Sequence, residues 1–157
     1  MYLNKREIEL CDTIDVIEEV LASGGEFKLY PKGKSMLPLI VEGEDSVVLS
    51  KHTGALKRHD IAFYRRKNGQ FVLHRVVKRE SDGSYVFCGD NQTVLERGIE
   101  ESQIIGIMTA LYKKEEPFSM TSFSHKLYLL IWCSIPIRKL LRFPRRCVNK
   151  LMRIIKK

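Results

Sequence analysis

The sequence predicts a mainly β fold, a small, partly closed antiparallel β-barrel or coiled sheet, and three observations support this. The 157 residues suffice for one ordinary domain with a core. From Glu26 to Tyr112 the chain is a series of short runs rich in β-branched and aromatic residues. Asn68-Gly69 and Asp82-Gly83 separate consecutive runs, and such pairs favour tight hairpin turns. Short antiparallel strands at this spacing are typical of a small barrel.

An amphipathic helix is expected before the strands, within residues 1–25. Asn4 suits the N-cap position, with Glu7 three residues later. Gly24-Gly25 suits the end of the helix. Apolar residues recur at helical spacing at Leu10, Ile14, Ile17 and Leu21. We expect this stripe to pack on the chain's own sheet, with docking to a partner as the alternative.

A β domain is expected over residues 26–116, followed by a tail over residues 117–157. Six runs in the β domain have the composition of strands. They are Phe27 to Tyr30, Ser46 to Ser50, Ile61 to Arg65, Phe71 to Lys78, Ser84 to Cys88 and Ile104 to Tyr112. Neither an internal repeat nor a low-complexity segment interrupts them.

The positive charge of the chain belongs to the tail. The whole chain has a formal net charge of +8, yet residues 1–116 carry a net charge of −2. Residues 117–157 contain ten Lys and Arg and no acidic residue. Such asymmetry indicates an anionic partner surface, either a membrane or a nucleic acid.

The tail also contains an apolar run, Leu127–Ile137, flanked by His125-Lys126 and Arg138-Lys139. Its eleven residues are fewer than the roughly 20 that span a bilayer. Trp132 and an all-basic polar face are typical of a helix in the membrane interface. We therefore expect residues 123–157 to bind a membrane surface peripherally, from the cytoplasmic side. A helical subdomain packed on the barrel is the alternative.

Nucleic acid is not expected as a partner. Proteins that bind single-stranded nucleic acid interleave aromatic stacking platforms with basic residues. In this tail the aromatic residues do not alternate with the charges, and Tyr128 and Trp132 lie in the apolar run.

Ser35 is the candidate nucleophile, in a loop between Gly33 and Pro38. A serine hydroxyl attacks poorly until a base removes its proton. A lone loop serine is usually a turn residue, so its interpretation depends on a base elsewhere in the chain.

His74 is the candidate base. It lies in an expected strand, with Val72 and Val76 as its neighbours on the same face. Apolar surroundings keep an imidazole neutral at pH 7, which suits a general base and equally suits a core histidine. Asp90 follows in the order Ser, His, acid that a serine hydrolase needs. Together the residues favour catalysis, although each alone does not.

The remaining cysteines and histidines point to no metal or cofactor site. The four cysteines are Cys11, Cys88, Cys133 and Cys147. They form no CxxC pair, and no histidine lies at zinc-ligand spacing from them. We expect reduced thiols, with Cys88 a buried structural residue despite its closeness to Asp90. Three histidines in polar or tail contexts are expected at the surface, at His52, His59 and His125. No metal or organic cofactor is called for.

Five segments in this order resemble the catalytic boxes of the signal peptidase I superfamily. They are Lys32–Pro38, His59–Tyr64, Leu73–Val77, Gly89–Gly98 and Ile104–Met108. The likeness is to the endoplasmic-reticulum, archaeal and sporulation-type branch, in which His replaces the lysine base. It covers roughly Phe27 to Leu111.

The resemblance implies a serine endopeptidase in which Ser35 is the nucleophile, His74 the general base and an acid the orienting group. Asp90 matches the first acid of the third box. Glu96 aligns with the acid that pairs with the base, where aspartate is usual. We name both acids, with Asp90 the stronger expectation for the site. The implied substrate is an extended peptide with a leader or signal sequence, bound along a sheet edge.

Three further departures separate the chain from this family. Gly33 stands where a serine commonly contributes to the oxyanion hole, and His59 stands where glycine is usual. The N-terminal transmembrane anchor of most signal peptidases is not seen in this sequence.

Two other functions remain open. A relative of self-cleaving repressors would share the serine box, but His74 in place of lysine disfavours it, as does the missing helix-turn-helix before residue 30. A catalytically inactive, membrane-docked interaction module is the other alternative, favoured by Gly33 and Glu96.

Overall fold

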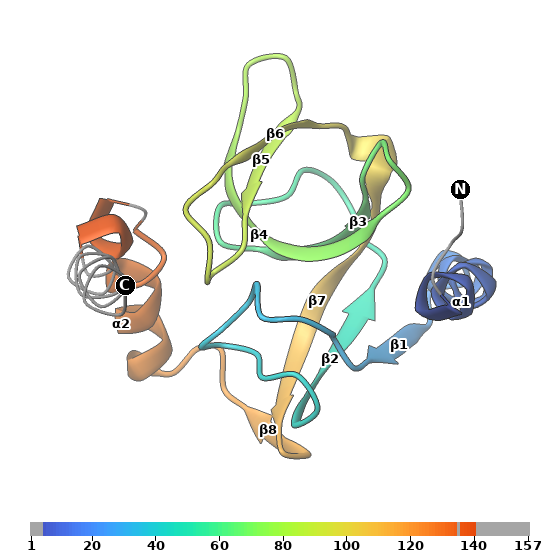
Figure 1. The fold of residues 1–157 in the computed structure, drawn as a ribbon, viewed down its shortest axis with the longest axis horizontal. Helices are drawn as coiled ribbons and strands as arrows, with labels where there is room; N and C mark the ends of the chain where they lie inside the picture. The colour runs from blue at the N-terminus through green and yellow to red at the C-terminus, as the bar shows by residue number, and fades with distance from the viewer. Residues whose placement is uncertain (1–4, 135, 141–157) are drawn as a thin grey trace, which may run out of the picture. The chain divides into compact units, whose positions relative to one another are not determined.

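The computed structural model describes the backbone of residues 5–134 and 136–140, and the side chains of these ranges from residue 13 onward. The chain divides into two compact units, residues 1–118 and residues 119–157. The first unit contains one helix, α1 (Lys5–Ala22), and an antiparallel sheet of eight strands (Figure 1). The prediction of a mainly β fold is therefore confirmed.

The six predicted strands are all present, and two short ones are added. In chain order they are β1 (Glu26–Leu29), β2 (Asp45–Ser50), β3 (Ile61–Arg65), β4 (Phe71–Arg79), β5 (Tyr85–Cys88), β6 (Glu96–Ile99), β7 (Ile104–Lys113) and β8 (Glu116–Phe118). A 3₁₀ turn, η1 (Glu101–Gln103), links β6 to β7. The sequence did not predict β6 and β8, because β6 contains a glycine and two charged residues and β8 contains a proline, and such residues are depleted in strands.

The sheet has the order β1-β2-β7-β3-β4-β5-β6, and β8 pairs with β7 outside this path. The long strand β7 is its centre, since it pairs with β2, β3 and β8. The sheet does not close into a barrel, which corrects the expected partial closure. Each end strand, β1 and β6, has four residues, two of them exposed, and short polar ends of this kind discourage further pairing.

Helix α1 packs its apolar stripe on the chain's own sheet, as expected. Ile14, Ile17 and Leu21 are buried. A Cβ on Gly106 of β7 would lie 2.8 Å from Leu21 Cδ1, so a glycine here lets the helix approach the strand. The helix stops before Gly24, whose φ of +83° favours glycine. Asn4 and the Leu10 side chain lie outside the described residues.

Two hairpins set the register around the central strands. Gly69 and Gly83 have φ values of +87° and +88°, as the predicted turns require. The first hairpin pairs β3 with β4 so that Ala62 lies opposite His74. Tyr64, two residues further along β3, shares that face and becomes a diagonal neighbour of the histidine.

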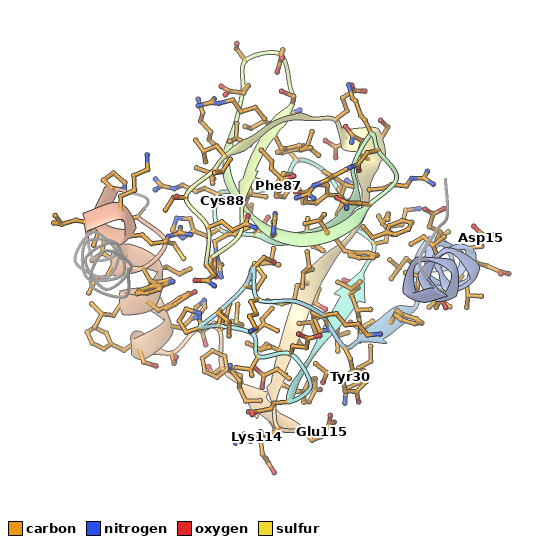
Figure 2. All side chains as sticks on the ribbon, viewed as in Figure 1. Asp15, Tyr30, Phe87, Cys88, Lys114 and Glu115 are labelled. Carbon is orange, nitrogen blue, oxygen red and sulfur yellow. The ribbon has the colours of Figure 1, made fainter. Side chains whose placement is uncertain are left out.

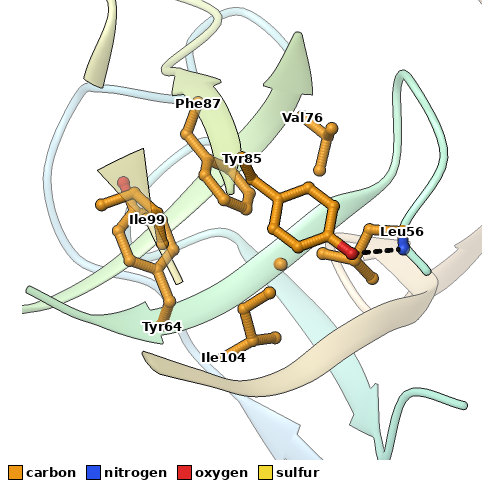
Figure 3. Packing of buried hydrophobic residues seen from close by; sticks show 8 residues of the cluster. Leu56, Tyr64, Val76, Tyr85, Phe87, Ile99 and Ile104 are labelled. Atoms are coloured by element: carbon orange, nitrogen blue, oxygen red, sulfur yellow. Dashed lines mark hydrogen bonds between the residues drawn. The ribbon is translucent and has the colours of Figure 1, made fainter. Parts of the chain in front are cut away.

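A buried cluster includes residues of this face (Figure 3). Its members come from five strands and one loop, and are Leu56, Ala62, Tyr64, Val76, Tyr85, Phe87, Ile99 and Ile104. The rings of Tyr64 and Phe87 stack with centroids 4.6 Å apart. The Tyr85 hydroxyl accepts a hydrogen bond from the Leu56 amide at 3.1 Å. The stacking holds Tyr64 firmly beside the histidine strand.

The second unit contains α2 (Phe123–Ile131). Ser122 caps it, since its hydroxyl accepts a hydrogen bond from the His125 amide at 3.2 Å. Residues 136–140 are also helical. Across the described parts of the chain, we find no helix with the length and apolarity to cross a membrane. Residues 141–157 of the expected membrane-binding tail lie outside the described residues.

Candidate active site

His74 is buried in β4, with 1% of its surface exposed. Its Nδ1 atom lies 3.0 Å from Glu96 Oε1 and 3.3 Å from the Tyr64 hydroxyl oxygen. The alternation of β4 puts Val72 and Val76 on the same face, so apolar residues flank His74 along its own strand.

The other ring nitrogen faces the segment after β5, where Gly89 lies between His74 and the Ser35 turn. A Cβ on Gly89 would lie 3.0 Å from His74 Nε2 and 2.7 Å from the Ser35 carbonyl oxygen. The Asn91 amide donates to that same carbonyl at 2.7 Å. Asn91 Nδ2 donates to the Lys34 carbonyl at 2.9 Å. Residues far apart in the sequence are thereby joined, with the Ser35 carbonyl and His74 Nε2 both next to Gly89.

The Ser35 turn is held by apolar side chains on one side. Met36, Leu39 and Ile40 are buried, whereas Ser35 is only half-buried. The Ile40 amide donates to the Met36 carbonyl at 3.0 Å and closes the turn. Gly33 begins it with φ at +95°, a conformation that other residues rarely adopt. The sequence thus presents a partly accessible serine on a rigid turn.

Glu96, at the start of β6, is the acid that contacts His74. Arg66 binds it through two nitrogens: Nε donates to Oε2 at 2.8 Å, and Nη2 pairs with Oε1. The Tyr64 hydroxyl donates to Oε2 at 3.0 Å. Both carboxylate oxygens are therefore held, and Oε1 is aimed at His74 Nδ1.

Asp90 has a different partner, so Glu96, which aligns with the acid that pairs with the base in the family that the sequence resembles, is the acid that contacts His74. It is 1% exposed and forms a two-point ion pair with Arg75, from Nε at 2.8 Å and Nη2 at 2.6 Å. Arg75 Nη1 also donates to the His59 carbonyl at 2.8 Å. Asp90 thus ties the start of the loop to β4 and to the approach to β3. Its role in the site is therefore to hold the backbone in place through Arg75.

The electrostatics suit a neutral base beside an ionised acid. Burial lowers the pKa of His74 below its ordinary value of 6.5, Glu96 opposes this, and the Arg66 charge adds to the lowering. Burial alone would raise the pKa of Glu96, but hydrogen bonds from Arg66 and Tyr64 and the nearby charges lower it overall. Burial, followed by the Glu96 charge, raises the pKa of Tyr64, which stays a donor.

These protonation states of Glu96 and His74 determine the tautomer of the imidazole. An ionised Glu96 accepts a hydrogen bond from Nδ1–H of neutral His74. The lone pair then lies on Nε2, which faces Gly89 and the Ser35 turn. A histidine held in this way can accept a proton from that side.

Sequence reasoning did not single out Tyr64 and Arg66. The Asn68-Gly69 turn implies the β3–β4 register, and that register could have placed Tyr64 diagonally beside His74. Arg66 had no comparable signal, because its contact depends on where the chain returns with Glu96 in β6.

The other expectations for cysteine and histidine have mixed outcomes. Cys88, labelled in Figure 2, is buried as expected, with Sγ within 3.4–3.5 Å of the carbonyls of Gly89, Gln92 and Val94. His125 was expected at the surface and is buried, because its ring packs on Tyr128 one turn along α2. Within the described side chains, no three His, Cys, Asp or Glu residues gather where they could hold a metal ion.

No model of a known protein family matches the chain, and neither does any curated protein. The site therefore has to be interpreted from its own geometry.

Proposed function

We propose that this chain is a signal-peptidase-like serine endopeptidase that cleaves a peptide bond in a leader or signal peptide. Ser35 is the nucleophile, His74 the general base and Glu96 the orienting acid. The observation that carries the proposal is the setting of the imidazole, with Nδ1 3.0 Å from Glu96 and Nε2 facing the Ser35 turn across Gly89. In a serine hydrolase of this kind, the serine lies at one nitrogen of the imidazole and an acid at the other.

The reaction is acyl transfer. His74 Nε2 takes the hydroxyl proton as Ser35 Oγ attacks the peptide carbonyl carbon, and Glu96 stabilises the imidazolium that forms. His74 then gives the proton to the leaving amine, and water hydrolyses the acyl-enzyme in the second half of the cycle. The Ser35 amide serves as an oxyanion donor. Gly33 supplies no side-chain donor, and one missing donor costs on the order of 10²-fold in rate.

The substrate class rests on the sequence resemblance and on one backbone feature. Lys32–Pro38 and Leu73–Val77 resemble the serine and histidine boxes of the Ser–His signal peptidases. His59 stands where those boxes usually have glycine, and its φ of +80° is a conformation that favours glycine. Both observations support the resemblance, and the resemblance implies an extended leader peptide as substrate.

The test is labelling of the full chain with a fluorophosphonate or a peptide aldehyde, together with mass spectrometry of cleaved leader peptides. Ser35→Ala and His74→Ala should each abolish labelling and cleavage. Ser46→Ala is the matched control, since Ser46 is buried in β2 and its hydroxyl has no hydrogen-bond partner among the described residues. Full activity in Ser35→Ala would overturn the proposal.

The same experiment distinguishes the proposed peptidase from a catalytically inactive module. Gly33 remains an argument for inactivity, because it removes one oxyanion donor. Glu96 no longer supports that alternative, since its carboxylate reaches His74 despite the longer side chain. An inactive module would show neither labelling nor cleavage in the wild-type chain.

A further inference from the structure

Helix α2 exposes its apolar side and buries a polar residue on the other. Phe123, Leu127, Leu130 and Ile131 are exposed by 81%, 44%, 71% and 41%. They lie at positions i, i+4, i+7 and i+8, which form one stripe along a helix. His125 projects from the opposite side and is only 3% exposed. In a soluble domain an amphipathic helix has the reverse orientation, with its apolar stripe in the core.

Exposed apolar residues continue beyond the helix. Ile137 and Leu140 are exposed by 38% and 72%. Isolated apolar side chains on a surface are ordinary, but a stripe of this length marks a surface that binds something apolar.

The charge of this unit identifies what that apolar surface meets. Lys126 and Lys139 are exposed next to the apolar residues, and residues 117–157 contain ten basic residues and no acidic one. A nucleic acid would satisfy the charges but not the apolar stripe. An anionic lipid surface satisfies both, because headgroups meet the lysines while acyl chains receive the apolar side chains.

The length of α2 determines how it would lie. Nine residues at 1.5 Å each make a helix of about 14 Å, against a hydrocarbon core of about 30 Å. Such a helix fits in the plane of the interface.

We propose that α2 is an interfacial membrane helix that inserts Phe123, Leu127 and Leu130 into an anionic bilayer, with Lys126 at the level of the phosphates. This inference stands apart from the proposed peptidase activity, since it rests on the second unit alone. It deepens the expectation for residues 123–157 by naming the side chains that enter the lipid.

The test is flotation of the full chain with phosphatidylcholine vesicles, with and without phosphatidylserine. Wild type should float with the anionic vesicles, and added salt should release it as the lysine charges are screened. Phe123→Ser/Leu130→Ser should lower partitioning by at least about tenfold, because two large apolar side chains no longer enter the lipid. Val16→Ser is the matched control, a 51% exposed apolar residue on α1, and should float as wild type does.

A second measurement needs no variant. Trp132, the only tryptophan, follows α2 directly, and its fluorescence should shift to the blue on addition of anionic vesicles. An unshifted emission together with absence from the floating fraction would overturn the proposal, whatever the variants do. Equal flotation of wild type and the Phe123/Leu130 variant would also overturn it. So would binding to single-stranded RNA that displaces the chain from vesicles and is unaffected by that variant.

Discussion

Asp90 and Glu96 lie six residues apart, and each forms a two-point pair with an arginine, yet their surroundings differ. Asp90 and Arg75 are buried, with side chains 1% and 4% exposed. Glu96 and Arg66 are partly open, at 19% and 31%. Each ion pair also contacts a third group, and these groups differ. Arg75 donates to the His59 carbonyl, whereas Glu96 contacts Nδ1 of His74. The same ion pair therefore supports the fold in one place and the candidate base in the other.

This difference separates effects on rate from effects on stability. A buried ion pair that loses one partner leaves an unpaired charge in a dry environment, at a cost of about 3–5 kcal/mol. A partly exposed pair contributes much less to stability, because water screens it. We therefore expect Asp90 to control folding and Glu96 to control catalysis.

The largest effect is expected at Glu96. Glu96→Gln removes the charge that stabilises the imidazolium and introduces an amide NH2 that can donate to Nδ1 and favour the wrong tautomer, so kcat/KM should fall by about 10³–10⁴-fold. The urea midpoint should change little. Peptide cleavage and urea unfolding of the same preparation check both statements. An unchanged rate would leave a Ser35–His74 dyad without an orienting acid.

The next effect is expected at Asp90, on stability. Asp90→Asn should lower the free energy of unfolding by about 3–5 kcal/mol, because Arg75 keeps its charge in a buried position. Urea unfolding measures this, and Glu80→Gln is the control, an acid whose ion pairs with Lys78 and Arg97 are more exposed. If Asp90→Asn is as stable as wild type but slow, the assignment of the two acids is reversed.

A smaller effect is expected at Arg66, on pH dependence. Catalysis needs neutral His74, so the rate rises with pH through the pKa of that residue. Arg66 helps to lower this pKa, so Arg66→Gln should raise it and move the acid limb of the pH–rate profile to higher pH. Arg65→Gln, an exposed neighbour on the other face of β3, should leave the limb in place. Coincident profiles for the two variants would remove Arg66 from the site.

The smallest effect is expected at Tyr64. Tyr64→Phe removes one hydrogen bond to Glu96 but keeps the ring on Phe87 and both contacts from Arg66. One such bond contributes about 1 kcal/mol, so kcat/KM should fall only several-fold. Steady-state kinetics beside Glu96→Gln measures this. A loss as large as that of Glu96→Gln would mean that catalysis depends on the contact of the Tyr64 hydroxyl with His74 Nδ1 as well.

The strands and the candidate residues could be predicted from the sequence, but the contacts between the candidate residues could not. Ser35, His74 and both acids lie in segments with recognisable patterns, and the Asn-Gly and Asp-Gly turns predicted the hairpins. Periodicity does not describe the path of residues 89–95, so it could not decide which acid meets His74. Strand β6 was also missed, because its four residues include a glycine and two charged residues. The contact of Arg66 with Glu96, which lies in β6, could therefore not be predicted. The closure of the sheet was also beyond local pattern, since it depends on how its two end strands pair.

Gly89 offers a way to separate the chemistry of the site from its geometry. A methyl group at this position would press on three polar atoms at once, at 2.7–3.1 Å: the Ser35 carbonyl, His74 Nε2 and Gln92 Oε1. Gly89→Ala would thus widen the gap between nucleophile and base while every reacting group stays in the chain. Under the proposed function, such a variant would be a substrate trap, able to hold a leader peptide without cutting it, and the captured peptide could be sequenced.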